Sequence, residues 1–442
     1  MSAQTELPRS WYRAMLPEEA PRAPLSGDVE TEVCVIGAGL AGLTTAHELV
    51  RRGRNVVLIE ANRIAWGASG RNGGFVSAGY AEGIEAIVAR AGRDAAVALH
   101  ALSAEGVEHV RGLVRRIAPA SLGGPGWVSV MRHPAAAELE RHRDRMDRDF
   151  GRVLEYWPSE RTRAVLKSRR YYEALLDPAA FHIQPLAYAR ALARDGEAMG
   201  LALHEGTPAT RLARKGAAHV VSAPEGSITA RHVVLAVSAY GRGLSRALDR
   251  TVLPVATYVG VTEPLGELAG AAIATPAAIS DDRRAGDYYR LVDGSRILWG
   301  GRITTRVSEP RRLAQMMRRD MLSVYPQLGL PRMDFAWAGL MGYARHKMPV
   351  IGREAEGLWH ATAFGGHGLN TTAMAGLVIA RAIDEGDDAF RRFAPFGPTW
   401  GGGPFGRLGV QLSYWGMQIQ DRIDEARAMR RQRRLSRPSA AR

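Results

Sequence analysis

The chain has 442 residues, 46% of them hydrophobic and 24% charged, which is an ordinary globular composition over a length that predicts two domains. No apolar run approaches the roughly 18 residues that a membrane-spanning helix needs, and the N-terminus lacks the basic-then-apolar pattern of a secretory signal. We therefore expect a cytoplasmic protein without integral membrane association, and the single cysteine, Cys34, excludes an internal disulfide.

The formal net charge of +14 raises the question of nucleic-acid binding, but the distribution of the charge argues against it. Seven arginines and no acidic residue lie in residues 427–442, so this tail carries half of the excess. The only lysines are Lys167, Lys215 and Lys347. We predict no nucleic-acid partner, and we expect residues 429–438 of the tail to be disordered.

Residues 31–60 carry the most informative pattern. A short apolar strand, Val33–Ile36, is followed by Gly37, Gly39 and Gly42 at G-x-G-x-x-G spacing, and then by an amphipathic helix over 43–52. The first glycine permits a tight turn, the second lets backbone N–H groups approach a pyrophosphate, and the third lets helix and strand pack closely. A second strand, 56–59, ends at Glu60.

A lone glycine motif is weak evidence, and the alternative is a glycine turn in some other α/β protein. The preceding strand, the following helix and the acidic residue about 20 positions on complete the dinucleotide-binding fingerprint. The Glu60 carboxylate can accept hydrogens from both ribose hydroxyls, and it would repel a 2′-phosphate, which disfavours NADP.

The next segment, 66–75, reads W-G-A-S-G-R-N-G-G-F. It offers many unhindered backbone N–H donors, one cation in Arg71 and one amide in Asn72. Such a loop suits a pyrophosphate and the polar edge of a flavin ring. A plain surface loop is the alternative, but the position directly after the second strand favours a cofactor loop and FAD over NAD.

The remaining elements predict two interleaved domains. Helices are expected over 83–117, 135–149 and 185–199, and strands over 201–204, 209–212, 219–222 and 232–237 return to the first domain. Strands over 251–262, 287–291 and 296–301 form a second sheet, and 335–339 and 350–352 lead back. We predict a lead-in over 1–30, a cofactor domain from 31–87, 180–250 and 335–395, a substrate domain from 88–179 and 251–334, and a C-terminal helix and basic tail over 396–442.

The predicted fold class is α/β, in which a doubly wound, Rossmann-like FAD-binding domain is interleaved with an α+β substrate domain on an antiparallel or mixed sheet. Near its end the chain repeats the strand, glycine turn and helix. Strand 358–363 enters a turn with Gly365, Gly366 and Gly368, and a small-residue helix follows. His367 lies inside this turn, where we interpret it mainly as a structural residue rather than a general base.

Together, the first glycine turn with Glu60, the W-G-A-S-G-R-N-G-G loop and the F-G-G-H-G-L turn resemble the D-amino-acid oxidase superfamily of FAD enzymes. Within it, the chain is most similar to the gamma-glutamylputrescine oxidoreductase branch. Further matches are Ser10–Tyr12 (S-W-Y), Asp287–Leu291 (D-Y-Y-R-L) and Val324–Leu328 (V-Y-P-Q-L). The resemblance covers nearly the whole chain, from about Ser10 to Phe393.

The motifs and the resemblance imply a set of FAD contacts. They are Gly37, Ala38, Gly39, Leu40, Ala41 and Gly42 in the first turn, Glu60 and Ala61 after the second strand, Ala68, Ser69, Gly70, Arg71, Asn72, Gly73 and Gly74 in the loop, Thr210, and Gly365, Gly366, His367, Gly368, Leu369 and Asn370 in the last turn. Some relatives attach the flavin through a cysteine near the C-terminal region, where this chain has none. We therefore expect noncovalent FAD.

The implied activity is oxidation of an amine C–N bond by hydride transfer to flavin N5, which gives an imine and then an aldehyde. Candidate catalytic or substrate-contacting residues are Tyr258, Trp299, His346 and Asn370. Packing within the fold is an equal alternative for Tyr258 and Trp299, and a partly exposed histidine without a role in the site is an alternative for His346. No metal is expected. The electron acceptor is oxygen or another oxidant.

Two departures from the pattern bear on the substrate. Sarcosine-oxidase-like enzymes carry a lysine beside the flavin on a strand of the second sheet, and the matching stretch here, 296–301, has none; the nearest residues are Leu298 and Trp299. They also place a carboxylate-binding lysine where this chain has Asn370. Both differences argue against a simple N-methyl amino acid.

Three functions remain open at this point. The first is oxidation of a secondary or terminal amine, such as a gamma-glutamylated polyamine. The second is a D-amino-acid dehydrogenase or oxidase, or a sarcosine-like oxidase, for which Arg290 and Arg302 are the candidate carboxylate partners on the second sheet. The third is a flavin-binding protein without catalytic turnover.

Overall fold

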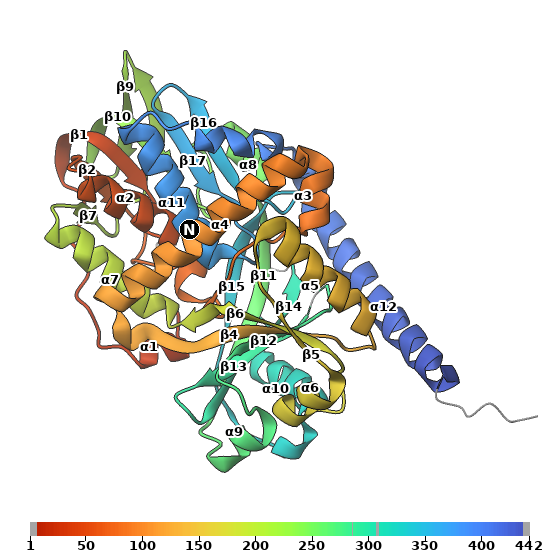
Figure 1. Ribbon diagram of the computed structural model, residues 1–442. Helices are drawn as coiled ribbons and strands as arrows, with labels where there is room; N and C mark the ends of the chain where they lie inside the picture. Colours follow the sequence, from red (N-terminus) through yellow and green to blue (C-terminus); the bar gives the residue numbers. More distant parts are fainter. Residues whose placement is uncertain (1–6, 285, 306–308, 436–442) are drawn as a thin grey trace, which may run out of the picture. The chain divides into compact units, whose positions relative to one another are not determined.

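A computed structural model describes residues 7–284, 286–305 and 309–435 of the chain. The chain forms two compact units (Figure 1). Unit 1 contains the residues up to Leu122, together with Ile183–Ala256 and Gly339–Arg407, and unit 2 contains Gly123–His182, Thr257–Ala338 and the residues from Leu408 on. The chain therefore passes between the two units several times.

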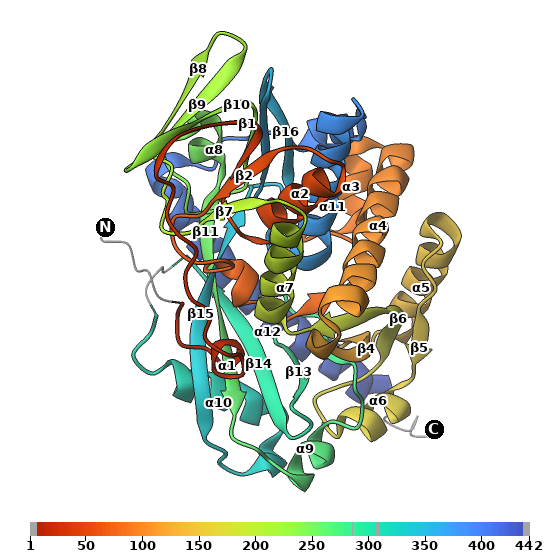
Figure 2. The same ribbon diagram turned by 90° about the vertical axis from the view of Figure 1, so that its left-hand side faces the viewer.

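Unit 1 is built on a sheet with the strand order β16-β17-β10-β1-β2-β7. Its strands are β1 (Gly27–Ile36), β2 (Val56–Ile59), β7 (Ala202–His204), β10 (Gly226–Leu235), β16 (Val350–Ala355) and β17 (Leu358–Thr362). The run from β17 through β10, β1 and β2 to β7 is parallel, and β16 joins it antiparallel. A hairpin of β8 (Arg211–Lys215) and β9 (Ala218–Ala223) continues from β10 (Figure 2).

Helices α2 (Leu40–Arg51), α4 (Arg93–Ile117), α7 (Pro185–Ala198) and α11 (Gly368–Asp384) cover one face of this sheet (Figures 1 and 2). Small residues let them approach closely: a Cβ added to Gly376 of α11 would lie 2.7 Å from the Cβ of Thr44 in α2. A Cβ at Gly106 of α4 would collide with the backbone carbonyl of Asn370 in α11. The shorter elements of unit 1 are α1 (Trp11–Ala14), η1 (Ala68–Gly70), β3 (Phe75–Val76), α3 (Ile84–Ala91), η2 (Pro119–Ser121), α8 (Arg246–Thr251) and η4 (Ala389–Phe396).

Unit 2 is built on a mixed sheet in which the strands follow the order β15-β11-β14-β13-β12-β4-β6, with β5 beside β6. These strands are β4 (Leu122–Val130), β5 (Glu155–Trp157), β6 (Ala174–Ile183), β11 (Leu253–Thr262), β12 (Ala278–Asp281), β13 (Tyr288–Val292), β14 (Arg296–Thr304) and β15 (Met333–Tyr343). Helices α5 (Ala136–Phe150), α6 (Ser159–Leu166), α9 (Glu267–Ala272) and α10 (Leu313–Val324), with η3 (Pro326–Leu328) and α12 (Gly403–Leu435), complete the list.

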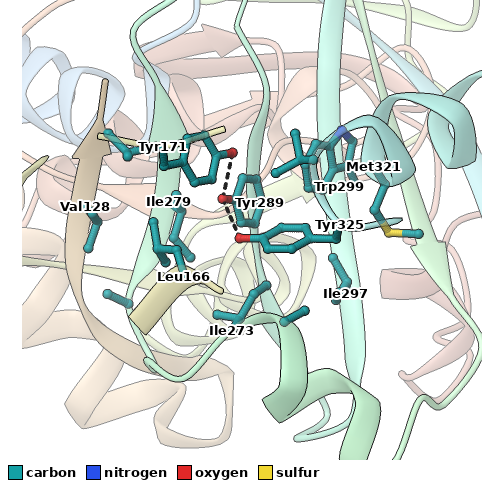
Figure 3. Close-up of a cluster of buried hydrophobic side chains, with 14 of the residues drawn as sticks. Val128, Leu166, Tyr171, Ile273, Ile279, Tyr289, Ile297, Trp299, Met321 and Tyr325 are labelled. Carbon is teal, nitrogen blue, oxygen red and sulfur yellow. Dashed lines mark hydrogen bonds between the residues drawn. The ribbon is translucent and has the colours of Figure 1, made fainter. Parts of the chain in front are cut away.

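The core of unit 2 contains a group of buried aromatic side chains (Figure 3). The Tyr289 hydroxyl lies 2.9 Å from those of both Tyr171 and Tyr325. Trp299 stacks on Tyr289 with a ring-centroid distance of 4.3 Å and an interplanar angle of 7°. The three phenol groups therefore satisfy one another inside an apolar surrounding.

The mixed α/β fold agrees with the predicted class, and three details differ from the sequence expectations. The helix expected over 83–117 is two helices, because Gly92 adopts a φ of 87° between α3 and α4. Residues 88–122 belong to unit 1 rather than to the substrate domain, because α4 packs on α11. The basic segment expected to be disordered, residues 429–438, is helical to Leu435, and residues 436–442 lie outside the described part of the chain.

Among the described residues, the structure contains no helix both long and apolar enough to cross a membrane.

Candidate cofactor site

Four chain segments meet at one edge of the unit 1 sheet. Ile36 at the end of β1 pairs with Ile59 of β2 and with Leu235 of β10, which pairs in turn with His360 of β17. Because these strands are parallel, the segments that follow them emerge on the same side. This edge, beyond the carboxyl ends of the strands, is where open α/β sheets bind ligands.

The first of these segments is the glycine turn between β1 and α2. Gly37 has a φ of 106°, and a Cβ there would lie 2.7 Å from the carbonyl oxygen of Ala236. A Cβ at Gly42 would collide with the carbonyl oxygen of Gly37. Gly39 is the N-cap of α2. Each glycine thus meets a steric requirement, and the turn presents the N-terminal end of α2, which favours an anion such as a pyrophosphate.

The second segment begins with Glu60. Its carboxylate accepts hydrogen bonds from the backbone N–H groups of Ala38 (2.8 Å) and Asn62 (2.9 Å). Burial, with a smaller contribution from the Glu205 carboxylate, raises the pKa of Glu60 above its usual range. The Glu60 side chain therefore holds the glycine turn against the end of β2, a role that the sequence did not indicate. Ala61 follows Glu60 directly.

The loop over 66–74 reaches the N-terminus of α2 through Ser69. The Ser69 hydroxyl accepts a hydrogen bond of 2.9 Å from the backbone N–H of Leu40, and a Cβ on Gly39 would lie 3.0 Å from the same oxygen. Ala41 and Gly42 follow Leu40 in the first turn of α2. The segment expected to contact a pyrophosphate is therefore already in contact with the helix that would bind it.

Two side chains of this loop, those of Asn72 and Arg71, form hydrogen bonds within the loop. The Asn72 amide donates to the carbonyls of Ala68 (3.1 Å) and Ser69 (3.0 Å) and accepts from the N–H of Gly74 (2.8 Å). The Arg71 guanidinium donates to the Trp66 carbonyl (2.8 Å) and lies 4.5 Å from the centre of the Trp66 ring. The hydrogen bonds of the Asn72 amide therefore shape the loop.

The remaining loop glycines serve the same compact geometry. A Cβ at Gly70 would lie 2.5 Å from the carbonyl oxygen of Ala65, and Gly74 has a φ of 86°. Gly73 lies between Asn72 and Gly74 in the buried part of the loop. The hydroxyl of Tyr12, from the S-W-Y segment, donates to the Asn72 carbonyl at 2.8 Å.

The segment that follows β17 is the turn between β17 and α11. Gly365 has a φ of 61°, and a Cβ there would lie 2.8 Å from the Tyr343 ring; a Cβ at Gly366 would lie 2.9 Å from the Tyr343 hydroxyl oxygen. His367 Nε2 lies 3.0 Å from the carbonyl oxygen of Ser77. Gly368 and Leu369 open α11, whose N-terminal end faces the turn.

All four candidate catalytic residues are buried. Asn370 is 1% exposed, and its amide donates to the backbone carbonyls of Gly79 (3.1 Å) and Ser103 (3.4 Å), so it joins the turn to α4. Trp299 is 0% exposed inside the aromatic core of unit 2. Both side chains are therefore enclosed by protein.

Tyr258 and His346 are also in contact with other parts of the protein. Tyr258 is buried against Leu313 and Met317 of α10. His346 Nδ1 accepts from the N–H of Met348 (3.2 Å), its Nε2 lies 3.2 Å from the Gly397 carbonyl oxygen, and burial lowers its pKa. Both ring nitrogens of His346 are therefore in hydrogen-bonding distance of backbone groups.

The side chains of three further candidates, Thr210, Arg302 and Arg290, also form hydrogen bonds or ion pairs within the protein. The Thr210 hydroxyl and N–H both donate to the Ser222 carbonyl (3.0 and 2.8 Å), within the β8–β9 hairpin. Arg302 pairs with Asp320 (2.9 Å from Nη2), and Arg290 is buried with its Nη1 2.9 Å from Nδ1 of His182. Neither arginine presents a free guanidinium to a substrate carboxylate.

The sequence reasoning missed three residues that shape the site. Tyr343 lies against the last glycine turn, Glu205 accepts from the N–H of Ile64 (2.7 Å), and Tyr240 packs edge-to-face on Trp66 with centroids 5.3 Å apart. Tyr240 follows the carboxyl end of β10. The rule that ligands bind beyond the carboxyl ends of parallel strands, which indicated Glu60, therefore applied to Tyr240 as well. No sequence signal indicated Tyr343, because its partner turn is 22 residues further along the chain.

The cradle of Gly37 and Gly42, the open end of α2 and the carboxylate of Glu60 therefore fit a dinucleotide cofactor. The chain matches the DAO family, described as FAD dependent oxidoreductase, over residues 32–382.

Individual relatives extend this match along the chain. Gamma-glutamylputrescine oxidoreductase of Escherichia coli (strain K12) is 32% identical over 428 residues, which cover 95% of this chain and 99% of that protein. The probable oxidoreductase OrdL of Haemophilus influenzae is 29% identical over 87% of this chain and 90% of its own length. In fold, the chain is similar to glycine oxidase from Geobacillus kaustophilus, with a TM-score of 0.70 at 19% identity over 84% of this chain and 99% of that one.

Proposed function

The chain belongs to the DAO family of FAD-dependent oxidoreductases, and we propose that it oxidises a C–N bond of a secondary or terminal amine, such as a gamma-glutamylated polyamine. The family includes relatives that act on amines and on amino acids. The observation that carries the choice is the similarity over nearly the entire length to an enzyme whose name specifies gamma-glutamylputrescine.

The engaged arginines of unit 2 support an amine over an amino acid. A substrate α-carboxylate needs a cationic partner, because desolvating it without one costs several kcal/mol. Arg302 is paired with Asp320 and Arg290 is buried against His182. An amine without an α-carboxylate places no such demand on these two residues.

Residues of unit 1 would hold the cofactor. The N-terminal end of α2 and the Ser69 hydroxyl would take the pyrophosphate, and Glu60 the ribose. When bound, FAD supplies the hydride acceptor for the carbon next to the substrate nitrogen. The positions of Gly37 and Gly42 keep side chains out of the path of the phosphates.

We propose that FAD binds noncovalently. The one cysteine, Cys34, is enclosed within β1, and burial raises the pKa of its thiol to about 12, so it carries no thiolate at neutral pH. Acid precipitation of the purified protein should release all of the flavin as intact FAD. Flavin that stays with the precipitate would show a covalent link.

The substrate is tested by anaerobic bleaching of the flavin band with a panel of compounds. We expect gamma-glutamylputrescine to reduce the flavin faster than putrescine, sarcosine, glycine or D-alanine. Faster reduction by glycine or a D-amino acid would replace the proposal with an amino acid oxidase or dehydrogenase, and no bleaching by any compound would favour a non-catalytic flavoprotein. Following reoxidation with oxygen and with a soluble quinone, each alone, then identifies the electron acceptor.

A further inference from the structure

The C-terminal helix α12 has an exposed apolar face. We define its apolar stripe as Leu408, Leu412, Trp415, Ile419, Ile423 and Met429, whose exposed fractions lie between 38% and 58%. From Leu408 to Ile423 these residues recur every three or four positions, so they lie along one side of the helix. A contiguous exposed apolar strip of this kind indicates an interaction surface.

Polar side chains of α12 attach the helix to unit 2. Gln411 Oε1 accepts from the Thr304 hydroxyl (2.9 Å) and the Thr305 N–H (3.0 Å). Asp421 pairs with Arg284 at 2.6 Å, and Glu425 lies 2.8 Å from Nε of Arg132. Val410, Tyr414 and Met417 are half-buried on the side that leads to Asp421, so this side of α12 lies on the protein and the apolar stripe faces outward.

The charges of α12 indicate what covers the stripe. Arg422, Arg427 and Arg430 are exposed on the same helix, and residues 427–442 contain seven arginines and no acid. The three acidic residues of α12 are Asp421, Asp424 and Glu425, and all of them pair with Arg284 or Arg132 of unit 2. The outer side of α12 therefore combines apolar side chains with the exposed, positively charged side chains of Arg422, Arg427 and Arg430.

We propose that α12 binds peripherally to an anionic lipid bilayer, with the apolar stripe in the interfacial region and the arginines on the lipid headgroups. This combination of a Trp- and Leu-bearing face with adjacent arginines is what interfacial helices use. A second copy of the chain fits less well, because the acids of α12 are already paired inward and none remains to neutralise the arginines of a partner helix. The inference is independent of the proposed substrate.

Vesicle flotation with the full-length, FAD-loaded protein tests the proposal. The protein should float with vesicles of phosphatidylglycerol mixed with phosphatidylcholine, and not with phosphatidylcholine alone. Trp415→Glu combined with Ile419→Glu should lower the bound fraction at least about tenfold, because the charges enter the region where apolar groups insert. Arg427→Gln and Arg430→Gln should each lower partitioning about fivefold, which corresponds to about 1 kcal/mol per arginine, and high salt should weaken binding.

Leu330→Glu is the matched control, since Leu330 is an 80% exposed apolar residue away from α12, and this variant should float like the wild type. The FAD content and thermal midpoint of every variant show whether it is folded. Equal binding to neutral and anionic vesicles, or unchanged binding of the Trp415/Ile419 variant, would overturn the proposal. A wild-type dimer that the same variant converts to a monomer, without vesicle binding, would assign the stripe to self-association, and binding only to an acidic protein would assign it to a protein partner.

Discussion

Substituting Gly37 by alanine tests whether glycine is required at this turn for its lack of a Cβ as well as for its backbone conformation. At Gly37 two penalties coincide: the φ of 106° is unfavourable for any residue with a Cβ, and that Cβ would lie 2.7 Å from the backbone oxygen of Ala236. The positive φ costs about 1–2 kcal/mol, and forcing atoms into a packed site typically costs about 1–3 kcal/mol. We expect Gly37→Ala to lower the free energy of unfolding by about 3 kcal/mol.

Two other glycines separate these penalties. Gly53 has a φ of 79° with nothing within 4 Å of an added Cβ, so Gly53→Ala should cost only about 1 kcal/mol. Gly112 is an exposed residue within α4 with no neighbour for a Cβ, so Gly112→Ala should stabilise by about 0.5–1 kcal/mol.

Urea denaturation of the FAD-free protein, followed by far-UV circular dichroism, gives the three stabilities, and quenching of flavin fluorescence gives FAD affinity. Only Gly37→Ala should weaken FAD binding, by at least about tenfold, because it displaces the turn that lies at the N-terminus of α2. If Gly37→Ala and Gly53→Ala were equally stable and bound FAD equally well, the collision with Ala236 would not be the reason for glycine at this position.

The other predictions concern single side chains. Glu60→Ala should weaken FAD binding by on the order of 1.5–3 kcal/mol in a fluorescence titration, and an unchanged affinity would remove Glu60 from the ribose site. Asn370→Ala should lower the free energy of unfolding by about 1–3 kcal/mol, since two backbone carbonyls lose their donor, while the KM for the amine stays within twofold; a large KM change without a stability change would restore Asn370 to the substrate site. Burial and the Arg290 charge lower the pKa of His182 to about 3, so the unfolded chain binds more protons below pH 6.5; stability should fall there by about 1.4 kcal/mol per pH unit from this group, and His182→Gln should show a correspondingly shallower slope in urea midpoints between pH 7 and 5.

The sequence by itself determined the cofactor unit, because its requirements are local. The turn from β1 into α2 needs glycine at Gly37 and Gly42 whatever surrounds it, and the alternation of strands and helices brings Glu60 to the same edge of a parallel sheet. The segments that form this edge, and the α/β class of the fold, could therefore be predicted from spacing and residue type.

The roles of individual side chains depended on the tertiary structure. Asn370 and His346 carry chemically capable groups, and nothing in their neighbouring sequence shows that Gly79, Ser103, Met348 and Gly397 occupy them. The outward apolar face of α12 could not be predicted either, because a helical pattern shows that one face is apolar but not which face the protein covers. Only the fold decides which distant segments meet, and therefore which polar groups are bonded to distant backbone.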